Sequence, residues 1–130
     1  MKILLFIFGI FVGSVFSLQE YFISAKDAKA KWGVENFNPE KFKSLKTTPV
    51  KRAPMAVELL VTQKLKGRKM SDVINLLGAQ DGYFFSDAIL AYKIQIPNSS
   101  SKESWQLLFI PDEELLNVKE IKIHRRCCGK

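Results

Sequence analysis

Reactive and metal-binding side chains are scarce in this chain. Among its 130 residues there are two cysteines, adjacent at Cys127 and Cys128, and a single histidine, His124. Neighbouring cysteines cannot close a long loop, so no disulfide framework holds the fold together. One imidazole beside two thiols also falls short of the usual four-ligand zinc site. We expect no metal site, and a frayed tail, residues 127–130, whose thiols are oxidised or paired between molecules.

Catalytic signatures are also missing. The sequence contains no glycine-rich phosphate loop and no nucleophile motif, and His124 lies in an alternating pattern typical of a strand surface. The carboxylates of Asp112–Glu114 are candidates for acid–base chemistry. They follow a proline in a predicted turn, however, where solvated charges are the ordinary outcome. We expect a protein without enzymatic activity and without a cofactor.

Residues 1–17 have the pattern of a secretory signal peptide. Lys2 precedes an apolar run, Ile3–Val12, and a smaller, more polar stretch ends at Ser17. We predict cleavage after Ser17 and a location in the periplasm or outside the cell. The alternative is an uncleaved membrane anchor, although the run is shorter than the roughly 20 residues that span a bilayer. Without a cysteine near the cleavage site, the chain is not expected to be a lipoprotein.

The chain is basic. Its formal net charge of +7 becomes +6 when Lys2 leaves with the signal segment. A basic exported protein is attracted to anionic lipid head groups or to acidic proteins, although such a charge also serves solubility alone. Residues 18–52, rich in lysine with phenylalanines between, are interpreted as a loosely structured N-terminal arm. This composition resembles a nucleic-acid-binding arm, but export argues against nucleic acid as a partner.

Two helices are predicted in the middle of the chain. The first spans Pro54–Lys66, because proline suits the first helical turn and apolar residues recur at helical spacing. Gly67 is expected to end it, since glycine readily adopts the left-handed conformation that terminates helices. Ser71 is expected to cap the second helix and Gly78 to close it. The positions that define this pair of helices are Gly67, Ser71, Val73, Leu77 and Gly78.

Strand periodicity follows the second helix. Residues 90–96, which include Tyr92, alternate apolar with polar, and residues 105–110 and 118–124 also favour strands. Tyr83–Phe85 favours a further short strand. Short connections imply antiparallel neighbours. The sequence therefore predicts an α+β fold in which a two-helix hairpin packs on a three- to four-stranded antiparallel sheet (ααβββ), as a single small domain over residues 53–126.

These features resemble a known family. Gly67, Leu77 and Gly78, followed by Tyr92 in a strand and by two further strands, are similar to the SmpA/OmlA (BamE) family of small periplasmic proteins. The resemblance covers about residues 59–123 and implies an ααβββ fold and a role in outer-membrane protein assembly. The same architecture is similar to that of beta-lactamase-inhibitor-type proteins, which also bind other proteins.

Two functions are compatible with these observations. The first is an exported binding module of the cell envelope that engages a protein or anionic lipid. Its candidate contact residues are the cations of the helical turn, Lys64, Lys66, Arg68 and Lys69, although a solvated turn is the simpler interpretation. The second is a small secreted inhibitor or stress protein without envelope retention. Because residues 105–110 are apolar on both faces, the sheet is also a candidate homodimer surface.

Overall fold

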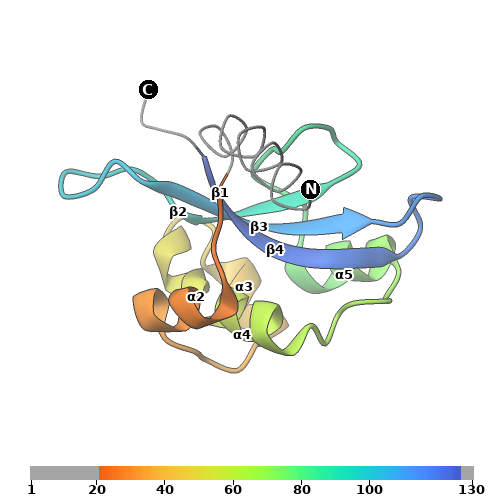
Figure 1. Cartoon of the computed structure of the whole chain (residues 1–130), viewed down its shortest axis with the longest axis horizontal. Helices are drawn as coiled ribbons and strands as arrows, with labels where there is room; N and C mark the ends of the chain where they lie inside the picture. The colour runs from red at the N-terminus through yellow and green to blue at the C-terminus, as the bar shows by residue number, and fades with distance from the viewer. Residues whose placement is uncertain (1–20, 127–130) are drawn as a thin grey trace, which may run out of the picture.

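The computed structural model describes residues 21–126. The predicted signal segment, residues 1–17, and the tail, residues 127–130, lie outside the described residues. The described chain forms a set of helices and one antiparallel sheet (Figure 1).

The elements follow one another from helices to strands, apart from a short first strand. The helices are α2 (Ala25–Trp32), α3 (Pro39–Ser44), the 3₁₀ helix η1 (Pro49–Arg52), α4 (Ala53–Thr62) and α5 (Met70–Leu77). The strands are β1 (Tyr21–Phe22), β2 (Leu90–Gln95), β3 (Ser104–Pro111) and β4 (Val118–Arg126). They form a sheet of order β1-β4-β3-β2 in which every pair is antiparallel.

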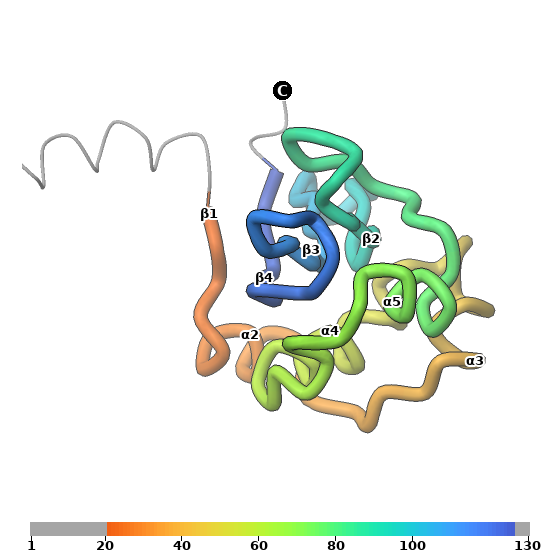
Figure 2. The backbone as a smooth tube through the Cα atoms, turned by 90° about the vertical axis from the view of Figure 1, so that its right-hand side faces the viewer, coloured from red at the N-terminus to blue at the C-terminus, as the bar shows by residue number. Residues whose placement is uncertain are grey.

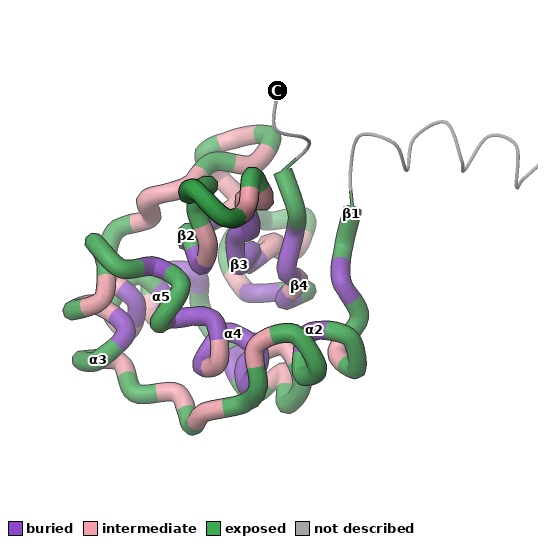
Figure 3. The backbone as a smooth tube through the Cα atoms, turned by 90° about the vertical axis from the view of Figure 1, so that its left-hand side faces the viewer, coloured by how far each residue is buried: buried purple, intermediate pink, exposed green. Residues whose placement is uncertain are grey.

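The helices cover one face of the sheet (Figure 2). Because side chains alternate along a strand, one set of apolar residues faces the helices. Tyr92, Leu107 and Ile123 of the strands are fully buried in one cluster with Met55 and Leu59 of α4. In Figure 3, the buried stretches of the backbone lie on α4 and on the strands, where these elements face one another. The predicted α+β class and single small domain are confirmed.

Tyr92 links the sheet to the end of α5. Its hydroxyl donates to the Gly78 carbonyl over 2.7 Å. Gly78 ends the helix with φ 91°, as predicted, and this left-handed value favours glycine. Val73 and Leu77 are buried on the core side of the same helix.

The pairing of the helices differs from the predicted hairpin. The helix α4 packs mainly against α2, and α5 packs against α3. The two helices predicted as a hairpin, α4 and α5, therefore each pack mainly against a different helix. The sequence interpretation missed this because it treated the segment before residue 53 as a loosely held arm, although helical turns at Ala25–Trp32 and a helix start at Asn38 were expected within it.

That N-terminal segment is not a loose arm over the residues that the structure describes. Ser24 caps α2 and Asn38 caps α3, each through a side-chain oxygen that accepts a backbone N–H. Phe42 is fully buried, and Arg52 is 2% exposed. Residues 21–52 thus contribute to the core, because Ile23, Ala28 and Phe42 belong to the same buried cluster as α4 and the strands.

The bounds of the two predicted helices also need correction. The first ends at Thr62, since Gln63 takes φ 54° and its side-chain amide donates to the Leu60 carbonyl. Gly67, with φ 89°, ends no helix; its N–H donates to the Val118 carbonyl instead. Ser71 does not cap α5, because the helix already begins at Met70 after Lys69.

The face of the sheet opposite the helices is crossed by residues 79–89, which we call the strap (Figure 2). The Gly82 N–H donates to the Ala91 carbonyl over 2.9 Å. Gln106 of β3 holds Tyr83 twice, because its Oε1 accepts the Tyr83 N–H and its Nε2 donates to the Tyr83 carbonyl. A segment other than the helices therefore covers part of the second face.

The short strand predicted at Tyr83–Phe85 does not form. Phe84 makes an isolated bridge to Ser86, and Phe85 has φ 69°, which turns the backbone out of an extended path. The fourth strand of the sheet is β1 instead, which pairs with the end of β4.

Candidate functional site

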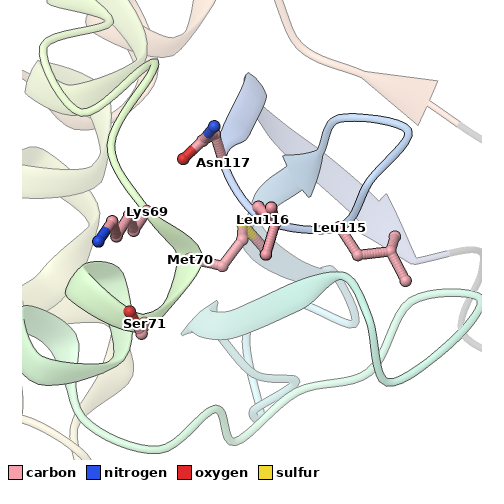
Figure 4. A pocket seen from close by; sticks show the side chains of 6 residues that line it. All are labelled: Lys69, Met70, Ser71, Leu115, Leu116 and Asn117. Carbon is pink, nitrogen blue, oxygen red and sulfur yellow. The ribbon is translucent and has the colours of Figure 1, made fainter.

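A groove lies between the start of α5 and the turn that joins β3 to β4. It has a volume of about 460 Å³. Figure 4 shows its lining side chains, which come from two segments far apart in the sequence: Lys69, Met70, Ser71, Leu115, Leu116 and Asn117. We call this feature the tip groove.

Backbone hydrogen bonds bring the two walls of the tip groove together. The Met70 N–H donates to the Leu116 carbonyl and the Val118 N–H donates to the Arg68 carbonyl, both over 2.8 Å. Lys69 and Asn117 form an antiparallel bridge. The segment before α5 thus lies beside β4 as a short additional strand. The Leu116 carbonyl also satisfies a backbone N–H at the start of α5, which explains how this helix begins without a side-chain cap.

The turn itself is held by Asp112. Its Oδ1 accepts the Leu116 N–H over 3.1 Å, and its backbone N–H donates to the Asn117 carbonyl over 2.9 Å. The hydrogen bond from Leu116 keeps the pKa of the Asp112 carboxyl below its usual value, so this acceptor is ionised at neutral pH. A fixed turn of this kind orients the side chains that follow the acidic residues.

Leu115 and Leu116 are presented to solvent by this turn. They are 58% and 59% exposed, and Leu115 has φ 64°. A left-handed conformation costs a branched residue such as leucine about 1 kcal/mol or more. The turn therefore keeps a large apolar side chain exposed in a conformation that the residue itself disfavours.

The charges around the tip groove are of both signs. Glu113 and Glu114 lie on the turn and line, with Asp112 and Lys119, a neighbouring hollow of about 480 Å³. Lys69 stands on the opposite wall of the tip groove. The apolar lining residues of the tip groove, Met70, Leu115 and Leu116, thus lie between acidic groups on one side and a basic group on the other.

The structure does not bring the four predicted cations together at one contact. Lys64 pairs with Glu58 over 3.0 Å, and Arg68 pairs with Asp72 over 3.5 Å. Lys69 lines the tip groove, while Lys66 is exposed in the turn that precedes it. Of the predicted contact residues, only Lys69 is a wall of this site.

Sequence reasoning missed the apolar half of the site. Leu115 and Leu116 follow three carboxylates in a predicted turn. Two adjacent leucines in a turn were the available signal, since turns usually carry polar residues. Met70 gave no such signal, because an apolar residue at the start of a helix is ordinary.

The tip groove is suited to binding. Its polar groups are the Lys69 amine, the Ser71 hydroxyl and the Asn117 amide, and no histidine lies among its lining residues. His124 is 5% exposed and lies beside Phe84 on the second face of the sheet. Between residues 21 and 126, no three histidine, cysteine, aspartate or glutamate side chains gather as metal ligands would.

Comparison of the chain with protein-family models, with curated proteins and with solved structures finds no match. Among the helices of residues 21–126, none has the length and apolar character needed to cross a membrane.

Proposed function

We propose that this protein is an exported binding module of the cell envelope and that the tip groove holds a partner protein. The observation that carries the proposal is the exposed Leu115–Leu116 pair on a turn fixed by Asp112. Burying a leucine side chain contributes about 1.5–3 kcal/mol. Two leucines held in place on a rigid turn lose little conformational entropy on binding, which favours recognition.

The charge pattern favours a protein over an anionic lipid surface at this site. Glu113 and Glu114 lie on the same turn as the leucines, and both are exposed. A negatively charged membrane would repel them. A protein that offers an apolar side chain flanked by charges of both signs would fit the groove and its rims.

We also propose that the protein is exported and that it is related to the SmpA/OmlA (BamE) family. Export is supported by the sequence pattern of residues 1–17. The succession α4, α5, β2, β3, β4 supports an ααβββ core similar to that of the SmpA/OmlA (BamE) family, with α2, α3 and β1 added to it. A role in envelope maintenance or outer-membrane assembly follows from that likeness.

The test is capture of a partner through the groove. A photo-activatable cross-linker at Asn117, which lines the groove beside the leucines, is expected to trap one envelope protein in cells. Leu115→Ser/Leu116→Ser should weaken binding of that purified partner at least about tenfold, because two apolar contacts are lost.

The matched control is Val50→Ser, which removes an apolar side chain that is 51% exposed on η1. It should leave partner binding unchanged. Equal loss of binding in the control variant, or full binding by the double leucine variant, would show that the tip groove is not the contact.

A further inference from the structure

A second exposed apolar surface lies on the face of the sheet away from the helices, where the strap meets β1. Phe85 is 79% exposed, Tyr83 55% and Phe22 39%. The Phe84 ring lies between them, 5.8 Å from the Phe85 ring and 6.1 Å from the Phe22 ring. We call Phe22, Tyr83, Phe84 and Phe85 the aromatic patch.

The strap holds this patch in one conformation. The Tyr83 hydroxyl donates to the Phe85 carbonyl over 2.9 Å, and Phe85 has φ 69°. Gln106 fixes Tyr83 from below through its side-chain amide. As with the leucines of the tip groove, a bulky residue is kept exposed on a left-handed backbone that it disfavours.

Cations stand beside the patch. The Lys122 ammonium lies 5.2 Å from the centre of the Phe22 ring. Lys122, His124 and Arg126 occupy every second position of β4. Because side chains alternate along a strand, all three lie on the same face of the sheet. Among the carboxylates, Glu120 shares this face of β4 by the same alternation and Asp87 belongs to the strap, and the chain without Lys2 carries a net charge of +6.

We propose that the aromatic patch docks on the surface of an anionic bilayer. Phenylalanine and tyrosine side chains partition into the boundary between head groups and acyl chains. Lys122 and Arg126 are placed to meet lipid phosphates, and each cation near such a surface strengthens binding roughly fivefold. This contact is separate from the tip groove, so a docked molecule would still present the groove to a protein partner.

The experiment is co-sedimentation of the purified chain, beginning at Leu18, with vesicles. Binding is expected to vesicles that contain phosphatidylglycerol, to weaken with added salt, and to be absent with phosphatidylcholine alone. Phe85→Ser should lower the affinity about tenfold, since one inserted aromatic ring is lost. Lys122→Gln and Arg126→Gln should each lower it roughly fivefold.

Matched controls separate this surface from the tip groove. Leu116→Ser removes an apolar group at the tip groove and Lys66→Gln removes an exposed cation in the turn before it, so vesicle binding should stay unchanged. Phe85 is largely exposed, so its variant is expected to keep the helical circular dichroism of the parent chain. If the variant binds anionic vesicles as well as the parent does, the proposal is overturned.

Two further results would also overturn it. One is binding to neutral vesicles as strong as to anionic ones. The other is a doubled mass in solution that Phe85→Ser returns to the monomer value, which would assign the patch to a second copy of the chain. Either result would leave the tip groove and its protein partner untouched, because that site is tested with different variants.

Discussion

Arg52 is a buried cation whose hydrogen bonds join three parts of the molecule. Its Nη1 lies 2.9 Å from Asp81 of the strap, and its Nε donates to the Phe42 carbonyl of α3 over 2.9 Å. A longer contact, 3.3 Å, runs to the Lys93 carbonyl of β2. The guanidinium also stacks on the Phe42 ring at 4.4 Å. Several partners thus compensate the cost of burying this charge.

Asp81→Ala is expected to destabilise the protein by about 3–5 kcal/mol, because it leaves the Arg52 guanidinium buried without its counter-charge. Urea unfolding followed by tryptophan fluorescence measures the change in the free energy of unfolding. The control is Asp72→Ala, which breaks the surface pair with Arg68 and should cost less than about 1 kcal/mol. Similar losses in the two variants would contradict the assigned role of Arg52.

His124 is buried beneath the aromatic patch. Its Nδ1 lies 3.4 Å from the Gln106 amide nitrogen, which can only donate, so Nδ1 accepts when the imidazole is neutral. Its Nε2 is buried without a hydrogen-bond partner among the described residues. Burial and the nearby charge of Arg126 lower the pKa of His124 to about 4.

Stability should therefore fall with acidification. The unfolded chain binds a proton at His124 near pH 6.5, whereas the folded chain does so only near pH 4, so protons favour unfolding in this window. The loss on going from pH 7 to pH 4 should be about 3 kcal/mol from this residue. Unfolding titrations of the parent and of His124→Gln at both pH values measure it; an equal pH dependence in the two proteins would contradict the assignment.

At the scale of elements, other parts of the chain bond along the edge strand β2 and along the portion of β4 that β1 does not reach. Along β2, the Gln80 Oε1 accepts the Ala91 N–H and the Asp81 Oδ1 accepts the Lys93 N–H. Along β4, β1 pairs near one end and the segment before α5 bonds at the other. Between these two contacts, the Gln63 side chain donates to the Ile121 carbonyl. Such coverage of an edge opposes strand-to-strand aggregation.

The strap depends on Gln106 for its attachment. Gln106→Ala removes two hydrogen bonds to Tyr83 and should loosen the strap while the sheet stays folded. Chymotrypsin should then cut at Phe84 or Phe85 several-fold faster than in the parent chain. Ser104→Ala on the same strand is the control. Unchanged cleavage in the Gln106 variant would mean that the remaining contacts of the strap, the hydrogen bonds of Gly82 and Asp81 and the packing of the Phe84 ring, hold it without Gln106.

At the scale of the whole molecule, the segment before α4 is bound to the rest by polar as well as apolar contacts. The Phe37 N–H donates to the Glu58 carboxylate over 3.0 Å, and the Trp32 indole donates to the Gln95 side chain over 3.1 Å. The rings of Trp32 and Trp105 meet edge to face at 5.2 Å. The first helices are therefore joined to α4 and to the sheet by hydrogen bonds and by ring contacts, and we expect them to unfold together with the sheet.

A chain of residues 53–126 alone should fail to fold, because Tyr92 and α4 would lose the covering layer of α2 and α3. Near-ultraviolet circular dichroism and urea titration are expected to show no cooperative transition. The chain beginning at Leu18 serves as the control and should keep one sharp transition. A well-formed transition in the shorter chain would show that the N-terminal helices are an appendage.

Local patterns were sufficient for much of this fold. The strand about Tyr92 and the strand over residues 118–124 follow from alternation, because successive side chains of a strand point to opposite faces of the sheet. Residues 105–110 follow instead from a short run that is apolar on both faces. The Gly78 cap likewise follows from backbone sterics. Ser24 and Asn38 carry equally local signals for α2 and α3, since side-chain caps act within one helical turn.

Contacts between distant residues were needed for the rest. Gln63 rather than Gly67 ends α4, because the Gln63 side chain finds the Ile121 carbonyl of β4. The start of α5 is set by the hydrogen bond from the Met70 N–H to the Leu116 carbonyl, which lies 46 residues after Met70 in the sequence. The tip groove forms only because this hydrogen bond joins its two walls, so no pattern within a short stretch of sequence predicts it. Residue spacing describes a single element, whereas hydrogen bonds between elements define where the site forms.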